Sequence, residues 1–343
     1  LKQPATWARI SFGAPVYNAP AVGETQTVAI RHGVNGVTAP DGAVGGHSEC
    51  GAQYNPNFFN GWGEANYANY TQINIQNQWD VADWPCFSRY YVTFPLDSLP
   101  QNAGVVSADL TMFMFGNAGY NAGDAKPSFI QVARVTGDWE ENALTWNNSP
   151  ALLENTSWTV VNPMQSGDPV PKPVTWDVSQ AVADARAAGE PLRLALYSSD
   201  GDYHSGKYFW SANAGEELRP LLKITWGNAG YSLSAVRIKA AIAAGETAEY
   251  ELNIAGLSSG ETVTLEAGQS SPAGLAVSVS PSTIAAPGGK AKVTLRAPGG
   301  DDSGQTTIYT VPVTASNGKQ TRTTELTVIV NGQFLFLPSV LRH

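Results

Sequence analysis

Short stretches in which apolar and polar residues alternate run through most of the chain. This period of two is typical of β-strands that bury one face. Glycine and proline, 34 and 22 of the 343 residues, separate most of the stretches with turns. In the first two-thirds of the chain, the predicted strands are Val16–Tyr17, Thr25–Arg31, Thr71–Asn77, Arg89–Phe94, Ala108–Phe115, Phe129–Val135, Trp158–Val161, Val174–Val178, Leu192–Tyr197, Lys207–Ser211 and Leu221–Trp226.

The last third of the chain repeats the same pattern in a more regular way. Seven short strands are predicted within about 100 residues, as is typical of an immunoglobulin-like sandwich. The Cys–Trp–Cys core of antibody domains is missing, so only the architecture is expected to be shared. These strands are Tyr231–Val236, Ala248–Ile254, Thr262–Ala267, Leu275–Val279, Ala291–Leu295, Thr307–Thr314 and Thr323–Val330.

The pattern therefore predicts an all-β protein in two parts. The strand count over the first 220 or so residues suits a two-sheet jelly roll. One helix is expected there, capped by Ser179, formed by Ala181–Ala188 and stopped by Gly189. The turn-like sequence Gly227–Gly230 predicts a boundary that gives a jelly-roll domain over residues 1–227 and an immunoglobulin-like domain over 228–332, followed by an apolar tail over 333–343.

Charge and composition narrow the class of protein. Only 14% of the residues are charged, against about 25% in an average soluble protein. The net charge is −9, which argues against binding of nucleic-acid phosphates or of an anionic bilayer surface. No apolar stretch is long enough to span a membrane. We expect a secreted protein of the bacterial cell surface, and the start at Leu1 is read as a mature chain whose signal peptide has been removed.

Two cysteines, Cys50 and Cys86, make up the whole thiol inventory. In a secreted protein an isolated pair usually forms one disulfide. Two free buried thiols are the alternative. The four histidines are scattered and give no zinc-type spacing with the cysteines.

A family resemblance covers residues 87–226. It rests on the blocks Arg89-Tyr90-Tyr91-Val92-Thr93-Phe94-Pro95-Leu96, Val135-Thr136-Gly137-Asp138-Trp139-Glu140-Glu141, Leu144-Thr145-Trp146-Asn147-Asn148-Ser149-Pro150, Val174-Thr175-Trp176-Asp177-Val178-Ser179 and Tyr208-Phe209-Trp210-Ser211. Together these resemble the DNRLRE family of secreted, carbohydrate-binding-module-like β-sandwiches. The resemblance implies a jelly roll, often attached to carbohydrate-active enzymes, and some members bind acidic polysaccharides. The C-terminal part is similar to bacterial immunoglobulin-like modules, which imply a spacing or assembly role.

Residues 1–86 match the family far less well, and residues 33–70 within them are interpreted as an insertion rich in aromatic residues. Aromatic rings stack on sugars and also anchor protein interfaces. Packing within a loop-rich core, a protein–protein interface and a glycan platform are all open for this segment. Its candidate residues are Tyr54, Phe58, Phe59, Trp62, Tyr67 and Tyr70.

Catalytic and metal signals are weak. Glu140 and Glu141 are adjacent, and neighbouring strand residues point to opposite faces, so they cannot flank one glycosidic bond from a strand. No nucleophile elbow, zinc-protease or phosphate-loop motif occurs. No cofactor is expected. Asp200 and Asp202 are a weak calcium candidate, and an exposed hairpin loop is the simpler interpretation. We expect the side chains of four tryptophans to stabilise the fold by burial and not to bind a ligand: Trp139, Trp146, Trp176 and Trp210.

The tail is the most unusual feature of the C-terminal part. Its apolar residues would form an exposed strand prone to aggregation unless something covers them. They could pair within their own domain or dock on another copy of the chain. The residues predicted to self-associate are Phe334, Phe336, Leu337, Val340 and Leu341.

Three classes of function compete. The first prediction is a non-catalytic structural subunit of an extracellular filament, sheath or surface layer, with copies of itself as the main partner. The alternative is a protein that binds an extracellular polysaccharide. An enzyme is nearly excluded because no nucleophile, metal set or cofactor loop is present. The apolar tail, the spacer-like domain and the weakly charged surface favour the structural subunit.

Overall fold

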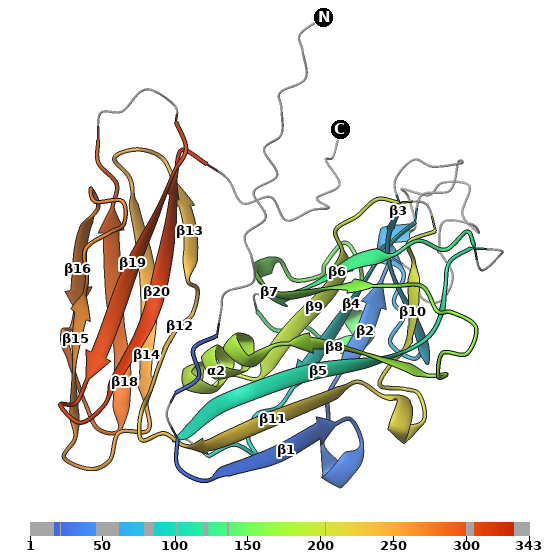
Figure 1. The fold of residues 1–343 in the computed structure, drawn as a ribbon, viewed down its shortest axis with the longest axis horizontal. Coiled ribbons are helices and arrows are strands. Elements are labelled where there is room, and N and C mark those ends of the chain that lie inside the picture. The colour runs from blue at the N-terminus through green and yellow to red at the C-terminus, as the bar shows by residue number, and fades with distance from the viewer. Residues whose placement is uncertain are drawn as a thin grey trace, which may run out of the picture.

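The computed structural model describes residues 17–20, 22–45, 62–78, 86–100, 102–119, 123–135, 137–202, 204–299 and 305–332. Strands make up almost all of the regular structure in these residues (Figure 1). The all-β sandwich fold predicted from the sequence is confirmed. Among the helices described, none has the length and apolar character needed to cross a membrane.

The described N-terminal part contains eleven hydrogen-bonded strands, nine of which follow one path. The path runs β1-β11-β5-β10-β3-β4-β9-β6-β7, with β2 beside β4 and β8 beside β5. It forms two layers that are joined where three residues of β3 pair with β4. The first layer contains β1, β11, β5, β10, β3 and β8, and the second layer contains β2, β4, β9, β6 and β7. The strands are β1 (Thr25–Arg31), β2 (Asp41–Val44), β3 (Gln72–Gln78), β4 (Cys86–Phe94), β5 (Ala103–Asn117), β6 (Ser128–Val135), β7 (Leu152–Val161), β8 (Lys172–Asp177), β9 (Leu192–Ser198), β10 (Lys207–Trp210) and β11 (Leu221–Asn228).

The main core lies between these two layers. One layer supplies Leu110 and Met112 of β5, and the other supplies Leu194 of β9, all of them fully buried. Trp176 of β8 lies in the same core, and its indole Nε1 donates to the Ile130 carbonyl at 3.2 Å. The alternation of the strand sequences is the cause, because every second side chain of each strand points into this space.

A smaller apolar cluster lies on the outer side of the second layer. Val44, Tyr91 and Ala195 are buried there beneath residues of the 139–152 segment. The Trp139 ring packs edge-on against Tyr91, with the centroids 6.3 Å apart. The Arg89 guanidinium lies over the Trp146 ring, with its central carbon 4.4 Å from the ring centroid. Trp139, Trp146 and Trp176 thus pack within the domain, as the sequence predicts.

The helix α2 (Ser179–Ala188) ends at Gly189, whose φ of 73° is the left-handed conformation that glycine adopts most readily. At its start, the Asp177 carboxylate accepts from the Ser179 backbone N at 2.9 Å. Ser179, which was expected to cap the helix, is thus its first residue, and Val178 at the N-cap position provides no side-chain cap. The helix contacts β5 on one side and the strands β12 (Ser232–Ala235) and β14 (Thr247–Ala255) on the other (Figure 1).

The C-terminal part is a second sandwich with its own core. A four-stranded sheet has the order β12-β14-β18-β16, and a five-stranded sheet has the order β13-β20-β19-β15-β17. Leu252, Val293 and Val328 are fully buried between the sheets. The remaining strands are β13 (Lys239–Ile242), β15 (Thr262–Ala267), β16 (Ala276–Ser280), β17 (Thr283–Ala285), β18 (Gly288–Arg296), β19 (Thr307–Ser316) and β20 (Thr321–Val330).

Three short strands were not predicted from the sequence. β13 and β17 have four and three residues, too few for an alternating pattern to be read. β2 lies in the segment interpreted as an insertion, yet it pairs with β4 as part of the sandwich. Conversely, one predicted strand is not observed at its described end: Tyr17 was predicted to end a strand and is not in one. Its hydroxyl donates to the Val105 carbonyl at 2.6 Å.

Candidate functional site

Four aromatic side chains gather on the outer side of the first layer. Phe113 and Phe115 of β5 and Tyr208 and Trp210 of β10 all point away from the core and are half-buried. The Phe115 centroid lies 4.4 Å from that of Trp210 and 6.1 Å from that of Tyr208. We call these four residues the aromatic face. Three rings in contact on neighbouring strands form a continuous, partly exposed apolar surface.

Strand alternation produces this face. In β10, Phe209 points inward and contacts Trp176, with ring centroids 6.2 Å apart, so Tyr208 and Trp210 must point outward. Gly116 of β5 pairs with Tyr208, and a Cβ added to this glycine would lie 3.2 Å from Tyr208 Cδ2. The lack of a side chain at Gly116 thus leaves room for the tyrosine ring.

Polar groups border the aromatic face. The Arg31 guanidinium of β1 lies 5.6 Å from the Phe113 ring centroid, a cation–π distance. Burial of Arg31 lowers the pKa of its guanidinium, although the group stays charged. Its Nε is buried and has no hydrogen-bond partner within the part of the chain that the structure describes. Hydroxyls of Thr111 and Thr175 meet nearby at 3.1 Å. Rings beside hydroxyls and one cation are suited to a ligand that has both apolar and polar faces.

A buried carboxyl fixes the chain just beyond Trp210. Asp41 Oδ2 accepts from the Ala212 backbone N at 2.9 Å and from the Tyr90 hydroxyl at 2.6 Å. The Ser211 backbone N donates to the Thr71 carbonyl at 3.0 Å. Burial raises the pKa of Asp41 to about 7, opposed by the two hydrogen bonds that it accepts. Asp41 therefore positions the end of β10, and Trp210 with it.

The other end of β10 is held by a buried lysine. Lys207 is fully buried, and its Nζ donates to the carbonyls of Lys126 at 2.5 Å and Ser205 at 2.6 Å. Burial lowers the pKa of its ammonium to about 8, although the nearby Asp200 acts in the opposite direction. Both ends of the strand that carries Tyr208 and Trp210 are thus anchored by buried polar groups, which keeps the two rings in fixed positions.

The structure describes only part of the aromatic segment predicted from the sequence. Tyr67 is buried in the main core, whereas Tyr70 is 45% exposed, and their rings meet edge-on at 5.5 Å. Trp62 begins the short helix η3 (Trp62–Glu64), but its side chain lies outside the described residues. Tyr54, Phe58 and Phe59 also lie outside them.

Two further sets of predicted residues fall outside the described chain. Cys50 lies there, and Cys86 begins β4 without a described side chain, so the disulfide stays a prediction. The tail is also outside, including all five residues predicted to self-associate: Phe334, Phe336, Leu337, Val340 and Leu341.

Of the two residues of the weak calcium candidate, Asp200 has a structural role. Asp200 Oδ2 accepts from the Phe129 backbone N at 2.6 Å and from the Ser198 hydroxyl at 3.0 Å. Asp202 is exposed. In the described ranges, no three histidine, cysteine or acidic side chains come close enough to hold one ion. Asp200 thus joins β6 to β9 by hydrogen bonds.

Glu140 and Glu141 lie in the 139–152 segment, where the chain turns as it covers the smaller apolar cluster. Glu140 is exposed, and Glu141 begins the short helix η4 (Glu141–Ala143). Partial burial raises the pKa of Glu141, and a hydrogen bond from Asn213 opposes this effect. The pair stands in a turn, which agrees with a structural role.

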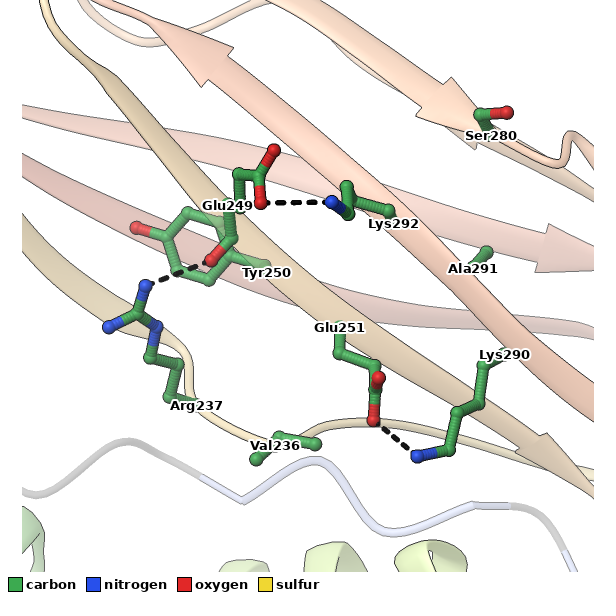
Figure 2. Close-up of a pocket in the computed structure, with 9 residues that line it drawn as sticks. All are labelled: Val236, Arg237, Glu249, Tyr250, Glu251, Ser280, Lys290, Ala291 and Lys292. Carbon is green, nitrogen blue, oxygen red and sulfur yellow. Dashed lines mark hydrogen bonds and ion pairs between the residues drawn. The ribbon is translucent and has the colours of Figure 1, made fainter.

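A shallow groove of about 500 Å³ lies on the outer side of β14 and β18 (Figure 2). Two ion pairs cross it, Glu249 with Lys292 at 2.9 Å and Glu251 with Lys290 at 2.7 Å. All four side chains are well exposed, so each pair contributes at most about 1 kcal/mol. The charges neutralise each other in pairs, and this groove is a weaker candidate than the aromatic face.

The aromatic face was missed because its signal is spread over distant strands. Phe113 and Phe115 alternate within β5, and Tyr208 and Trp210 alternate within β10. Each pair reads as an ordinary strand face, and only the pairing of the two strands brings the rings together. Trp210 was expected to serve the fold, whereas it lies on this outer face.

Comparison with known families bears directly on this part of the chain. Residues 60–226 match the model of carbohydrate-binding module family 96. This region is a carbohydrate-binding-module-like domain. The match runs from before β3 to Trp226 within β11 and so includes the whole aromatic face. It supports the polysaccharide-binding alternative over the structural subunit that the sequence analysis favoured.

No curated protein matches the chain. Among solved structures, a β-glucuronidase from Parabacteroides merdae is 13% identical, with a TM-score of 0.24 over 89% of this chain and 36% of that chain. The VesB protease of Vibrio cholerae is 10% identical, with a TM-score of 0.23 over 67% of this chain and 98% of that one. The chain thus spans about a third of the glucuronidase, and these similarities are too low to bear on function.

Proposed function

We propose that this protein binds an extracellular polysaccharide and that the aromatic face is the contact surface. Sugar rings present apolar C–H faces between hydroxyl edges. Phe115, Tyr208 and Trp210 would stack on the former. Arg31 and the threonine hydroxyls would hydrogen-bond the latter. The observation that carries the proposal is the contact of three partly exposed rings on two neighbouring strands, within the region that matches a carbohydrate-binding family.

We expect the aromatic side chains to change conformation little when the ligand binds. Fixed rings bind with a smaller loss of side-chain freedom than mobile ones. The anchors at Asp41 and Lys207 hold both ends of β10, so the rings are positioned before the ligand arrives. We further propose that the domain acts without catalysis and that the protein is secreted.

We assign the C-terminal sandwich an immunoglobulin-like architecture and a spacer role, with the domain boundary at residues 227 and 228. β12 pairs antiparallel with β14 in one sheet, and β13 pairs parallel with β20 in the other. The chain therefore crosses from one sheet to the other between β12 and β13. The outer groove of this sandwich is crossed by two ion pairs, and Tyr250, the aromatic residue in its lining, is buried. These features favour a supporting role over direct ligand binding.

Affinity electrophoresis tests the proposal. The full chain is run through gels that contain xylan, hydroxyethylcellulose, laminarin or polygalacturonate, and retardation measures binding. Trp210→Ala and Tyr208→Ala should each weaken binding at least about tenfold, which corresponds to about 1.4 kcal/mol and is typical of a central aromatic contact. Lys319→Ala, an exposed change on the C-terminal sandwich, is the matched control and should bind as the wild type does.

Tyr70→Ala distinguishes this face from the aromatic segment predicted from the sequence. Tyr70 is the most exposed described ring of that segment. If Tyr70→Ala abolished binding while Trp210→Ala and Tyr208→Ala bound normally, the contact surface would lie at the segment instead.

A further inference from the structure

The opposite side of the same domain carries a second exposed ring surface. Trp158 and Val160 of β7 are 47% and 48% exposed, the largest exposures of β7 and β6 side chains of this size. The Phe129 ring of β6 lies beside Trp158, with the centroids 5.0 Å apart. These strands belong to the second layer, whereas the aromatic face is on the first. The outer sides of two stacked sheets face away from each other, so the two surfaces lie on different outer sides of the sandwich.

We propose that Trp158, Phe129 and Val160 form a second sugar-binding surface, so that one molecule bridges two polysaccharide chains. The proposal rests on the proposed function, since it takes the ligand of the aromatic face to be a polysaccharide. It adds a second site and a consequence, cross-linking, that a single binding face could not produce.

Amide groups beside the rings favour a sugar ligand. Gln131 of β6 pairs in register with Trp158 on one side and with Tyr197 of β9 on the other. The Tyr197 hydroxyl donates to Gln131 Oε1 at 2.6 Å and also contacts the Asn155 amide oxygen. Burial raises the pKa of Tyr197 to about 12, so its hydroxyl proton is retained. The amides are therefore held in place next to an accessible ring, an arrangement suited to hydroxyl groups.

The size of the surface argues against a protein partner. A stable interface between two proteins buries about 800 Å² on each side. One aromatic side chain buries at most about 250 Å², so Trp158 and a half-buried Phe129 fall well short of this area. The rings and amides at this surface carry no charge, so a highly charged protein partner is not favoured. A narrow polymer that lies across the rings fits better than a second copy of the chain.

Stoichiometry and cross-linking together test this inference. The ligand is a short oligosaccharide of whichever polysaccharide retards the protein most among xylan, hydroxyethylcellulose, laminarin and polygalacturonate. Isothermal titration of the full chain with this oligosaccharide counts the binding sites. Light scattering of the full-length polysaccharide then measures bridging. We expect two sites for the wild type, one for Trp158→Ala and one for Trp210→Ala. Either substitution should reduce the scattering increase at least tenfold, while Lys319→Ala leaves it unchanged.

Each outcome separates the second surface from the first. One site in the wild type, or two sites in Trp158→Ala, would overturn the second surface and leave the aromatic face intact. No binding by the wild type to any of the four polysaccharides would overturn both. A wild-type dimer that Trp158→Ala makes monomeric, without polysaccharide, would show a self-interface and overturn the inference. Trp158→Phe, which keeps a ring, should retain both sites, and circular dichroism confirms that each variant is folded.

Discussion

At the residue scale, the buried carboxyl of Asp41, which holds the end of β10 and so the aromatic face, makes the stability of the fold depend on pH. Its pKa is about 7 in the folded protein, against about 3.9 in an unfolded chain. Folding therefore favours the protonated form. The resulting stability is fully present below about pH 4 and is lost as the pH rises to about 7, by up to about 4 kcal/mol.

Asp41→Asn checks this expectation because the amide keeps an acceptor for Ala212 and Tyr90 without titrating. Chemical denaturation from pH 4 to pH 7 should show the free energy of unfolding falling in the wild type relative to the variant. Parallel profiles for the two proteins would show that Asp41 is not the group that titrates.

The buried Lys207 predicts a trend of opposite sign at higher pH. Its pKa is about 8 when folded and about 10.4 when unfolded, so the unfolded chain binds the proton more tightly. Stability should therefore rise between about pH 8 and pH 10, by about 2–3 kcal/mol, as the folded lysine becomes neutral. A neutral amine still has two hydrogens for the carbonyls of Lys126 and Ser205.

Lys207→Met isolates this contribution, since it keeps the length of the side chain and removes the charge. Urea denaturation at pH 8, 9 and 10 should give a rising free energy of unfolding in the wild type and a flatter profile in the variant. A wild-type profile as flat as that of Lys207→Met would exclude a lowered pKa.

At the scale of elements, Cys50 and Cys86 are predicted to close a long loop by a disulfide before β4. In the chain-entropy model, a loop of about 37 residues gives about 3–4 kcal/mol of stability. Titration of the denatured, unreduced protein should find no reactive thiol. Two reactive thiols would contradict the disulfide, and a Cys50→Ser, Cys86→Ser variant that melts at the wild-type temperature would contradict its contribution to stability.

The strands themselves were largely predictable. Those with six or more residues and one buried face, such as β14 and β20, follow directly from alternation. β2 was not predicted because Asp41-Gly42-Ala43-Val44 has no polar alternation and is buried at every position. The aromatic face could not be predicted for a different reason. It depends on which strands become neighbours, and the alternation of β5 and β10 does not specify that β10 pairs with β5.

At the scale of the whole molecule, two cores divide the chain on either side of Gly227–Gly230. The cluster of the N-terminal part ends with Ile224, and that of the C-terminal part begins with Tyr231. We therefore expect a chain truncated after Gly227 to fold and to bind the polysaccharide with the affinity of the full chain. Loss of binding in a truncated protein with normal circular dichroism would show that the C-terminal sandwich contributes to the site.

Binding of polysaccharide through the aromatic face is the central claim, and Trp210 is its most direct test. Affinity electrophoresis of the wild type, Trp210→Ala and Lys319→Ala should be run side by side on the four polysaccharides, with melting temperatures measured in parallel. We expect the wild type and Lys319→Ala to be retarded equally, whereas Trp210→Ala should bind at least about tenfold more weakly and remain folded. Equal retardation of all three proteins would contradict the claim.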